Sequence, residues 1–105
     1  MDIAPDEVAD LQREGPVQMI DVREPYEWEA GRIPGTRHIT LGLVAQEAPS
    51  IDRDAPVVFI CRVGGRSTMA ANAFRRAGYE AYSLAGGVEA WEARGMPFEG
   101  EVAEH

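Results

Sequence analysis

The residues Val57-Val58-Phe59-Ile60-Cys61-Arg62-Val63-Gly64-Gly65-Arg66-Ser67 place the only cysteine of the chain between an apolar run and a glycine-rich segment. The four apolar residues Val57–Ile60 predict a buried strand. Apolar residues at three- and four-residue spacing between Ala70 and Ala77 predict a helix that begins near Ser67 or Thr68. Cys61 is therefore expected at the junction between a strand and a helix.

The segment after Cys61 is suited to stabilising negative charge. Gly64 and Gly65 tolerate positive φ, so backbone N–H groups can curl inward ahead of a helix N-terminus. Arg62 and Arg66 add two permanent positive charges. A free cysteine has a pKa near ~8.5, and such surroundings lower it. An isolated cysteine at a strand end is more often an inert core residue, but the glycines and arginines favour a nucleophile here.

Length and composition predict one globular domain over residues 1–105. This length suffices for one hydrophobic core but not for two. No segment is apolar enough to span a bilayer, and the acidic N-terminus lacks the basic-then-apolar order of a signal peptide. A single cysteine excludes an internal disulfide. These observations favour a cytoplasmic location without membrane association.

The charge distribution excludes one class of ligand and favours another. A net charge of −8 argues against nucleic-acid binding, which requires a basic surface. Residues 55–79 contain four arginines and no acid, so they carry +4 and the rest of the chain carries −12. This positive segment around the thiol is expected to attract small anions. The pair Arg75–Arg76 could instead be a solvated helix face.

Helical and strand patterns alternate along the chain. Such alternation predicts an α/β fold with a mostly parallel sheet and helices on both faces. The predicted strands are Val17–Val22, Arg37–Ile39, Val57–Ile60 and Glu80–Leu84, and the predicted helices are Pro5–Arg13, Glu24–Ala30, Leu41–Ala48, Thr68–Ala77 and Val88–Arg94. The tail Glu99–His105 is expected to fray.

Polar or small residues lie at the ends of three of the predicted strands. They are Asp21-Val22-Arg23, the loop after Cys61, and Ala85-Gly86-Gly87. In open α/β sheets the active crevice lies beyond the carboxyl ends of the strands, so these segments are expected to converge. Asp21 could accept a hydrogen bond from a loop N–H, pair with Arg23, Arg32 or Arg66, or simply cap the strand end.

The chain resembles the single-domain rhodaneses, the thiosulfate sulfurtransferase family. Ordered motifs within residues 20–97 carry the resemblance, namely Ile20-Asp21-Val22-Arg23-Glu24, Tyr26-Glu27-Trp28, Gly31-Arg32-Ile33-Pro34-Gly35, the loop Cys61–Ser67 and Leu84-Ala85-Gly86-Gly87-Val88. The resemblance implies a rhodanese-like α/β domain with a central five-stranded, mostly parallel sheet. It places the active loop at the carboxyl edge of that sheet.

The resemblance also implies a mechanism. Cys61 would take the outer sulfur of thiosulfate or a similar anionic donor as a persulfide, and cyanide or a thiol would then accept that sulfur. The loop residues are expected to bind the donor and the persulfide, namely Arg62, Val63, Gly64, Gly65, Arg66 and Ser67. Asp21, Arg23 and Arg32 are expected to support the loop. No cofactor is implied, and one cysteine with two scattered histidines predicts no metal site.

Three positions depart from the pattern common in the family. Arg32 and Thr36 stand in place of a histidine and an alanine, and Thr40 stands in place of a proline. All three lie outside the nucleophile loop. We therefore expect them to affect access or partner choice more than the chemistry.

Two other classes of function remain open. The first is a phosphatase or arsenate reductase of a related fold. Protein tyrosine phosphatases use a cysteine and an arginine separated by five residues, whereas four separate Cys61 from Arg66. A loop shorter by one residue leaves less room for a phosphate. The alternative is a non-catalytic interaction module, or a sulfur relay that docks onto a protein partner. The acidic composition would favour a cationic partner.

Overall fold

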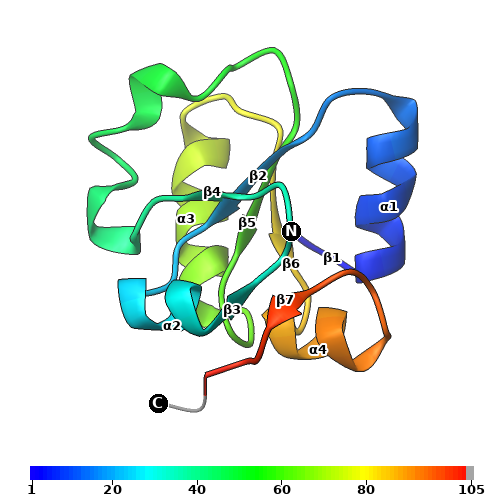
Figure 1. The fold of residues 1–105 in the computed structure, drawn as a ribbon. Coiled ribbons are helices and arrows are strands. Elements are labelled where there is room, and N and C mark those ends of the chain that lie inside the picture. Colours follow the sequence, from blue (N-terminus) through cyan, green and yellow to red (C-terminus); the bar gives the residue numbers. More distant parts are fainter. Residues whose placement is uncertain (104–105) are drawn as a thin grey trace.

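A five-stranded parallel sheet forms the centre of the computed structural model, which describes residues 1–103 (Figure 1). Its strand order is β1-β6-β5-β2-β4, and a separate antiparallel pair joins β3 to β7. The strands are β1 (Asp2–Ile3), β2 (Gln18–Asp21), β3 (Gly31–Arg32), β4 (Arg37–His38), β5 (Val57–Ile60), β6 (Ala81–Leu84) and β7 (Glu99–Gly100). The α-helices are α1 (Pro5–Glu14), α2 (Pro25–Ala30), α3 (Gly65–Arg76) and α4 (Gly87–Ala93), with 3-10 turns η1 (Leu41–Leu43) and η2 (Ala48–Ser50).

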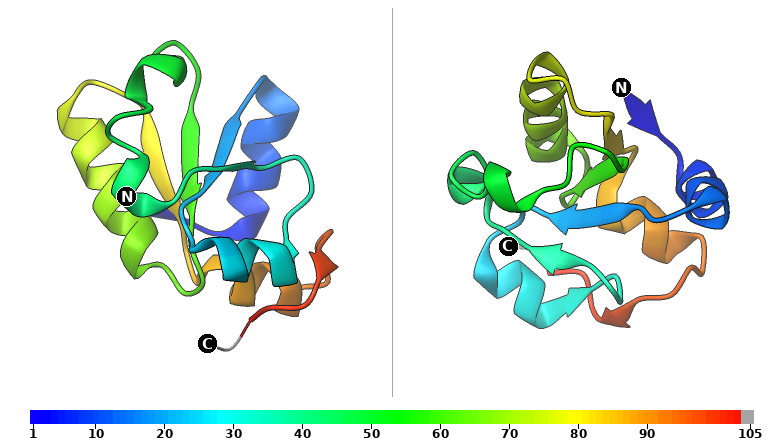
Figure 2. Two further views of the ribbon diagram at one scale, coloured as in Figure 1. Left: turned by 60° about the vertical axis from the view of Figure 1, so that its left-hand side comes forward. Right: turned by 90° about the horizontal axis from the view of Figure 1, so that it is seen from above.

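Alternate residues of β5 face opposite sides of the sheet, and each side has its own core. Val57 and Phe59 pack with Phe74 and other residues of α3 on one side. Val58 and Ile60 pack on the other side with residues of α1 and α4. The predicted sheet with helices on both faces is therefore confirmed (Figure 2). Among the described residues, no helix is long and apolar enough to cross a membrane.

The fifth strand of the sheet comes from the N-terminus. Asp2 and Ile3 pair in parallel with Ser83 and Leu84 of β6. Two residues are too few to produce a visible alternation of polar and apolar side chains. The sequence pattern therefore does not predict this strand, although the family resemblance implies five strands.

The helix after the active loop begins earlier than predicted. The pattern places its start near Ser67 or Thr68, but α3 begins at Gly65 with Gly64 as its N-cap. Gly64 has φ +124°, a backbone region that glycine enters without steric penalty. Gly65 is a poor helix former, yet it occupies the first helical position. The early start brings the first-turn N–H groups of α3 close to Cys61.

Two further predictions were wrong. The segment expected to be helical over Leu41–Ala48 instead forms the 3-10 turns η1 and η2, since Gly42 and Pro49 both interrupt a regular helix. The tail expected to fray is partly paired, because β7 lies antiparallel to β3 and the Glu101 N–H donates to the Ala30 carbonyl at 2.9 Å. Residues 104–105 of that tail lie outside the described residues.

Candidate active site

Cys61 follows β5 directly and is almost fully buried at the carboxyl edge of the sheet. The loop after β5, α2 and α4 gather at this edge, which lies at the bottom of Figure 1. The first turn of α4 holds the loop backbone. The Val88 N–H donates to the Cys61 carbonyl at 2.9 Å, and the Glu89 N–H donates to the Arg62 carbonyl at 3.2 Å. The strand end before Cys61 and the Gly86-Gly87 turn therefore converge, as the sequence predicted.

The Cys61 sulfur accepts hydrogen bonds from its own loop. The Gly64 N–H lies 3.0 Å from Sγ, and the Ser67 hydroxyl lies 3.4 Å from it. Burial raises the pKa of the Cys61 thiol, but hydrogen bonds from the Ser67 side chain and from the backbone of Ser67, Gly64 and Val63 outweigh burial. The net pKa is lowered, as expected. The thiolate is therefore favoured at neutral pH relative to an ordinary cysteine.

Both arginines of the loop are paired with acids. Arg62 forms an ion pair with Glu89 at 2.7 Å. Arg66 donates to both carboxylate oxygens of Glu27, at 2.6 and 3.0 Å. Two of the four arginines of the positive segment are thus paired with acids that lie far away in the sequence. Hydrogen bonds from Ser67, Gly64 and Val63 are the main effects that lower the pKa of Cys61.

Glu27 lies in the site, although the sequence pattern assigned it no role beyond its place in a family motif. Its side chain is 5% exposed, and it connects α2 to the N-terminus of α3 through Arg66. The Glu24 N–H also donates to Glu27 Oε1 at 3.0 Å, which closes the first turn of α2. The capping-box spacing of Glu24 and Glu27 marks only the helix start. The bidentate ion pair fixes the first turn of α3, from which Ser67 points to the thiol.

The variant Glu27→Gln is expected to lower the free energy of unfolding at neutral pH by about 1–2 kcal/mol, because Arg66 loses a charged partner and is only partly exposed. The hydrogen bond from Arg66 lowers the pKa of Glu27 from 4.5, against the opposing effect of burial. The ion pair therefore stabilises the fold above that pH and loses its effect as pH falls through the lowered folded-state pKa. Urea unfolding as a function of pH measures both effects.

The matched control for this variant is Glu47→Gln. Glu47 pairs with Arg37 at 3.3 Å, and both side chains are well exposed. Its loss is expected to cost less than about 0.5 kcal/mol. Equal losses of unfolding free energy in the two variants would show that the pair between Arg66 and Glu27 does not support the loop. So would a stability difference between Glu27→Gln and the wild type that persists at acid pH.

Of the three residues predicted to support the loop, Asp21 and Arg23 form a pair, whereas Arg32 lies in β3 and contacts Trp28. Asp21 and Arg23 are fully buried and form a bidentate ion pair, with Arg23 also donating to the Gly31 carbonyl at 2.7 Å. Of the partners considered for Asp21, the structure therefore selects Arg23. Arg32 lies over the Trp28 ring, 5.0 Å from its centre. Their polar contacts within residues 1–103 hold the ends of β2 and α2 and do not reach the thiol.

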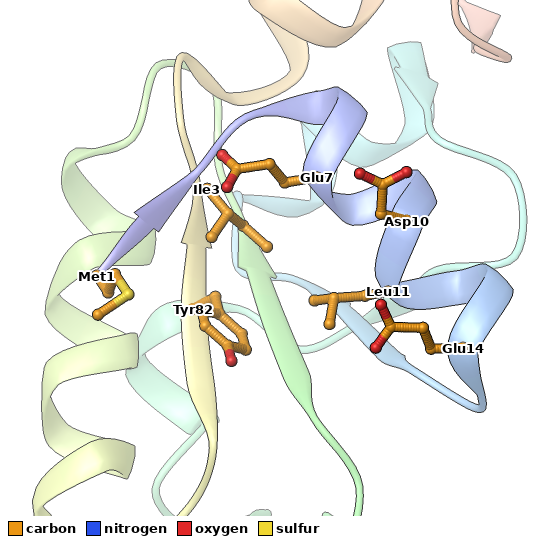
Figure 3. A pocket seen from close by; sticks show the side chains of 7 residues that line it. All are labelled: Met1, Ile3, Glu7, Asp10, Leu11, Glu14 and Tyr82. Carbon is orange, nitrogen blue, oxygen red and sulfur yellow. The ribbon is translucent and has the colours of Figure 1, made fainter.

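A pocket of about 290 Å³ lies between α1 and the β1–β6 edge of the sheet (Figure 3). Its lining combines apolar side chains with three carboxylates: Met1, Ile3, Leu11, Tyr82, Glu7, Asp10 and Glu14. The Tyr82 hydroxyl donates to Glu80, which raises the pKa of Tyr82 to about 12 and keeps it protonated. This acidic lining is unsuited to an anionic donor.

Comparison with known proteins gives the same family at the level of sequence and of structure. The Rhodanese-like domain model matches residues 4–94. Thiosulfate sulfurtransferase GlpE of Pseudomonas aeruginosa is 41% identical over 90 residues, which cover 85% of this chain and 81% of that protein. A rhodanese-related protein from Thermoplasma volcanium superposes with a TM-score of 0.85 at 25% identity, covering 95% of this chain and 98% of the other. A rhodanese-like domain protein from Staphylococcus aureus gives a TM-score of 0.78 at 28% identity, covering 86% and 89%. The chain therefore belongs to the rhodanese-like domain family.

Proposed function

We propose that this protein is a sulfurtransferase that moves the outer sulfur of thiosulfate, or of a similar anionic donor, to a nucleophilic acceptor through a persulfide on Cys61. One observation carries the proposal: Sγ of the only cysteine accepts a hydrogen bond from the Gly64 N–H and lies 3.4 Å from the Ser67 hydroxyl at the start of α3. The name of the Pseudomonas aeruginosa relative, a thiosulfate sulfurtransferase, supports the choice of donor.

The reaction takes place in two balanced steps. The Cys61 thiolate attacks the outer sulfur of thiosulfate, the S–S bond of the donor breaks, and sulfite leaves with the bonding pair. The product is a Cys61 persulfide anion. An acceptor then attacks the terminal sulfur, and the thiolate leaves. Cyanide gives thiocyanate, and a thiolate gives a new persulfide. Neither step requires a cofactor.

The loop contributes mainly through its backbone. The first-turn N–H groups of α3 have no acceptor within the helix and concentrate positive potential near Sγ. They would bind the donor and then the persulfide charge, with Val63, Gly64 and Gly65 giving the loop its shape. Arg66 still interacts electrostatically with the thiolate, since Cys61 contributes to raising the pKa of Arg66. Arg62 and Arg66, held by Glu89 and Glu27, would support the loop and attract the donor.

A phosphatase or arsenate reductase is the weaker candidate. An arginine that clamps phosphate needs both of its terminal nitrogens, and those of Arg66 donate to the two carboxylate oxygens of Glu27. The binding of an oxyanion by Arg66 would therefore compete with a largely buried carboxylate. The site as folded favours a sulfur donor that reacts at the thiolate.

The proposed acceptor is a small thiol, or a cysteine on a cationic segment of a partner protein in the cytoplasm. The acidic pocket beside α1 supports a cationic partner, because Glu7 and Glu14 border an apolar floor that includes Leu11. Faster sulfur transfer to a lysine-rich cysteine peptide than to a neutral one would favour the protein acceptor. Equal rates would favour small thiols.

Intact mass spectrometry after incubation with thiosulfate tests the proposal. The protein is expected to gain the mass of one sulfur and to lose it on addition of cyanide, with release of thiocyanate. Protein alkylated at Cys61 beforehand is the control and should gain nothing. If the unalkylated protein gains no mass from thiosulfate although its thiol has a lowered pKa, the result would favour another sulfur donor or a phosphatase activity. If its thiol pKa is ordinary, the protein is an interaction module.

A further inference from the structure

A buried hydroxyl on the neighbouring strand lies behind the catalytic loop. Ser83, on β6, is fully buried, and its Oγ lies 2.7 Å from Oγ of Ser67. We propose that Ser83 is a positioning residue, which donates its proton to Ser67 and so directs the Ser67 proton to the sulfur of Cys61. The inference concerns the same site as the proposed sulfur transfer and rests on it.

The Ser67 hydroxyl has one proton and three acceptors within reach. These are Sγ of Cys61 at 3.4 Å, the Gly64 carbonyl at 3.2 Å and Oγ of Ser83 at 2.7 Å. Only a proton directed to Sγ stabilises the thiolate. The geometry of the neighbouring groups therefore decides whether Ser67 contributes to the chemistry.

The Gly64 carbonyl is already occupied. It accepts the Thr68 N–H at 3.0 Å and the Thr68 hydroxyl at 2.7 Å. A carbonyl oxygen has two lone pairs, and these two donors fill both of them. Ser67 is left with a choice between the sulfur and Ser83.

Ser83 settles that choice through its own proton. Its Oγ has two polar neighbours among the described residues, Ser67 at 2.7 Å and the Thr68 hydroxyl at 3.3 Å. A buried hydroxyl must donate, and the shorter contact is to Ser67. Donation to Ser67 uses the Ser67 lone pair and leaves its proton for Cys61. Hydrogen bonds in such a chain also polarise one another, which strengthens the bond to sulfur.

Two charged groups lie near this hydroxyl chain. Asp2 Oδ1 lies 3.4 Å from the Thr68 hydroxyl, and Arg66 precedes Ser67 in α3. Arg66 is paired with Glu27. Neither group contacts Ser83 directly, so Ser83 can be changed without altering a charge.

The test is a double-mutant cycle read by the thiol pKa, obtained from the pH dependence of iodoacetamide alkylation of Cys61. Ser67→Ala is expected to raise the pKa so that thiolate at neutral pH falls about tenfold. In Ser83→Ala the Ser67 hydroxyl loses the donor that polarises it, so its bond to sulfur weakens and thiolate falls about threefold. Because Ser83 acts through Ser67, the double variant should match Ser67→Ala alone. Additive shifts, or no shift in Ser83→Ala, would overturn the proposal.

Two features keep the result interpretable. Ser83→Cys replaces the hydroxyl by a slightly larger thiol that is a weaker donor, so it is expected to fold and to give a smaller shift than Ser83→Ala, with peptide mapping used to separate alkylation of Cys61 from alkylation at position 83. If Ser83→Ala unfolds, Ser83→Cys is compared with the wild type in its place. An unchanged pKa of the Cys61 thiol in Ser83→Cys would count against the proposal. Alkylation needs no thiosulfate, so the absence of sulfur loading would refute the proposed function without deciding the role of Ser83.

Discussion

The variant Cys61→Ser is expected to lose thiosulfate-to-cyanide sulfur transfer by at least about 10³-fold. An oxygen nucleophile at this position would remain a neutral hydroxyl, because the hydrogen bonds that lower the pKa of the thiol cannot bring an alcohol into the neutral range. It would also be a poor nucleophile towards sulfur. Thiocyanate formation at saturating thiosulfate measures the loss directly.

Serine is nearly isosteric with cysteine, so the fold should be retained. The near-ultraviolet circular dichroism and the unfolding midpoint of Cys61→Ser provide the control. The chain has no second cysteine to take over the reaction. A variant that folds normally and retains even a tenth of the turnover would show that the nucleophile is not Cys61. Binding of a partner protein that survives in Cys61→Ser would identify a relay that also docks.

The parts of the site that follow from neighbouring residues could be predicted from the sequence. The buried strand Val57–Ile60, the thiol after it and the glycines of the loop are contiguous, and the strand and the convergence of its end with the Gly86-Gly87 turn are confirmed. The electrostatics could not be predicted in the same way. Glu27 lies 39 residues from Arg66, and Glu89 lies 27 residues from Arg62. Only the folded topology brings these acids to the loop.

The missed elements have a similar physical cause. A strand of two residues, such as β1 or β7, carries no periodicity, and its existence depends on an edge or a partner strand formed elsewhere. The sequence pattern places the start of α3 too late because Gly65 has low helix propensity, which tertiary contacts override. Ser83 likewise carries no local signal, since one serine in a strand gains meaning only from the Ser67 hydroxyl opposite it.

The variant Gly87→Ala is expected to lower the free energy of unfolding by about 3–5 kcal/mol. Gly87 has φ +59°, and a Cβ atom there would lie less than 3.0 Å from the backbone carbonyls of Cys61 and Arg62. These atoms belong to the backbone that follows β5 and cannot move aside like a flexible side chain. Relief requires that α4 move away from the loop, which would stretch the hydrogen bonds of Val88 and Glu89.

Gly95→Ala is the matched control, because Gly95 has φ +72° but no atom lies within 4 Å of the position that an added Cβ would occupy. It carries the backbone strain without the collision and is expected to cost only about 1 kcal/mol. The excess loss in Gly87→Ala therefore measures the close approach of α4 to the Cys61 loop. Gly87→Ala should also raise the pKa of the Cys61 thiol, since a displaced loop weakens the hydrogen bond from the Gly64 N–H to sulfur. Equal losses in the two variants, with an unchanged thiol pKa, would show that α4 does not position the loop.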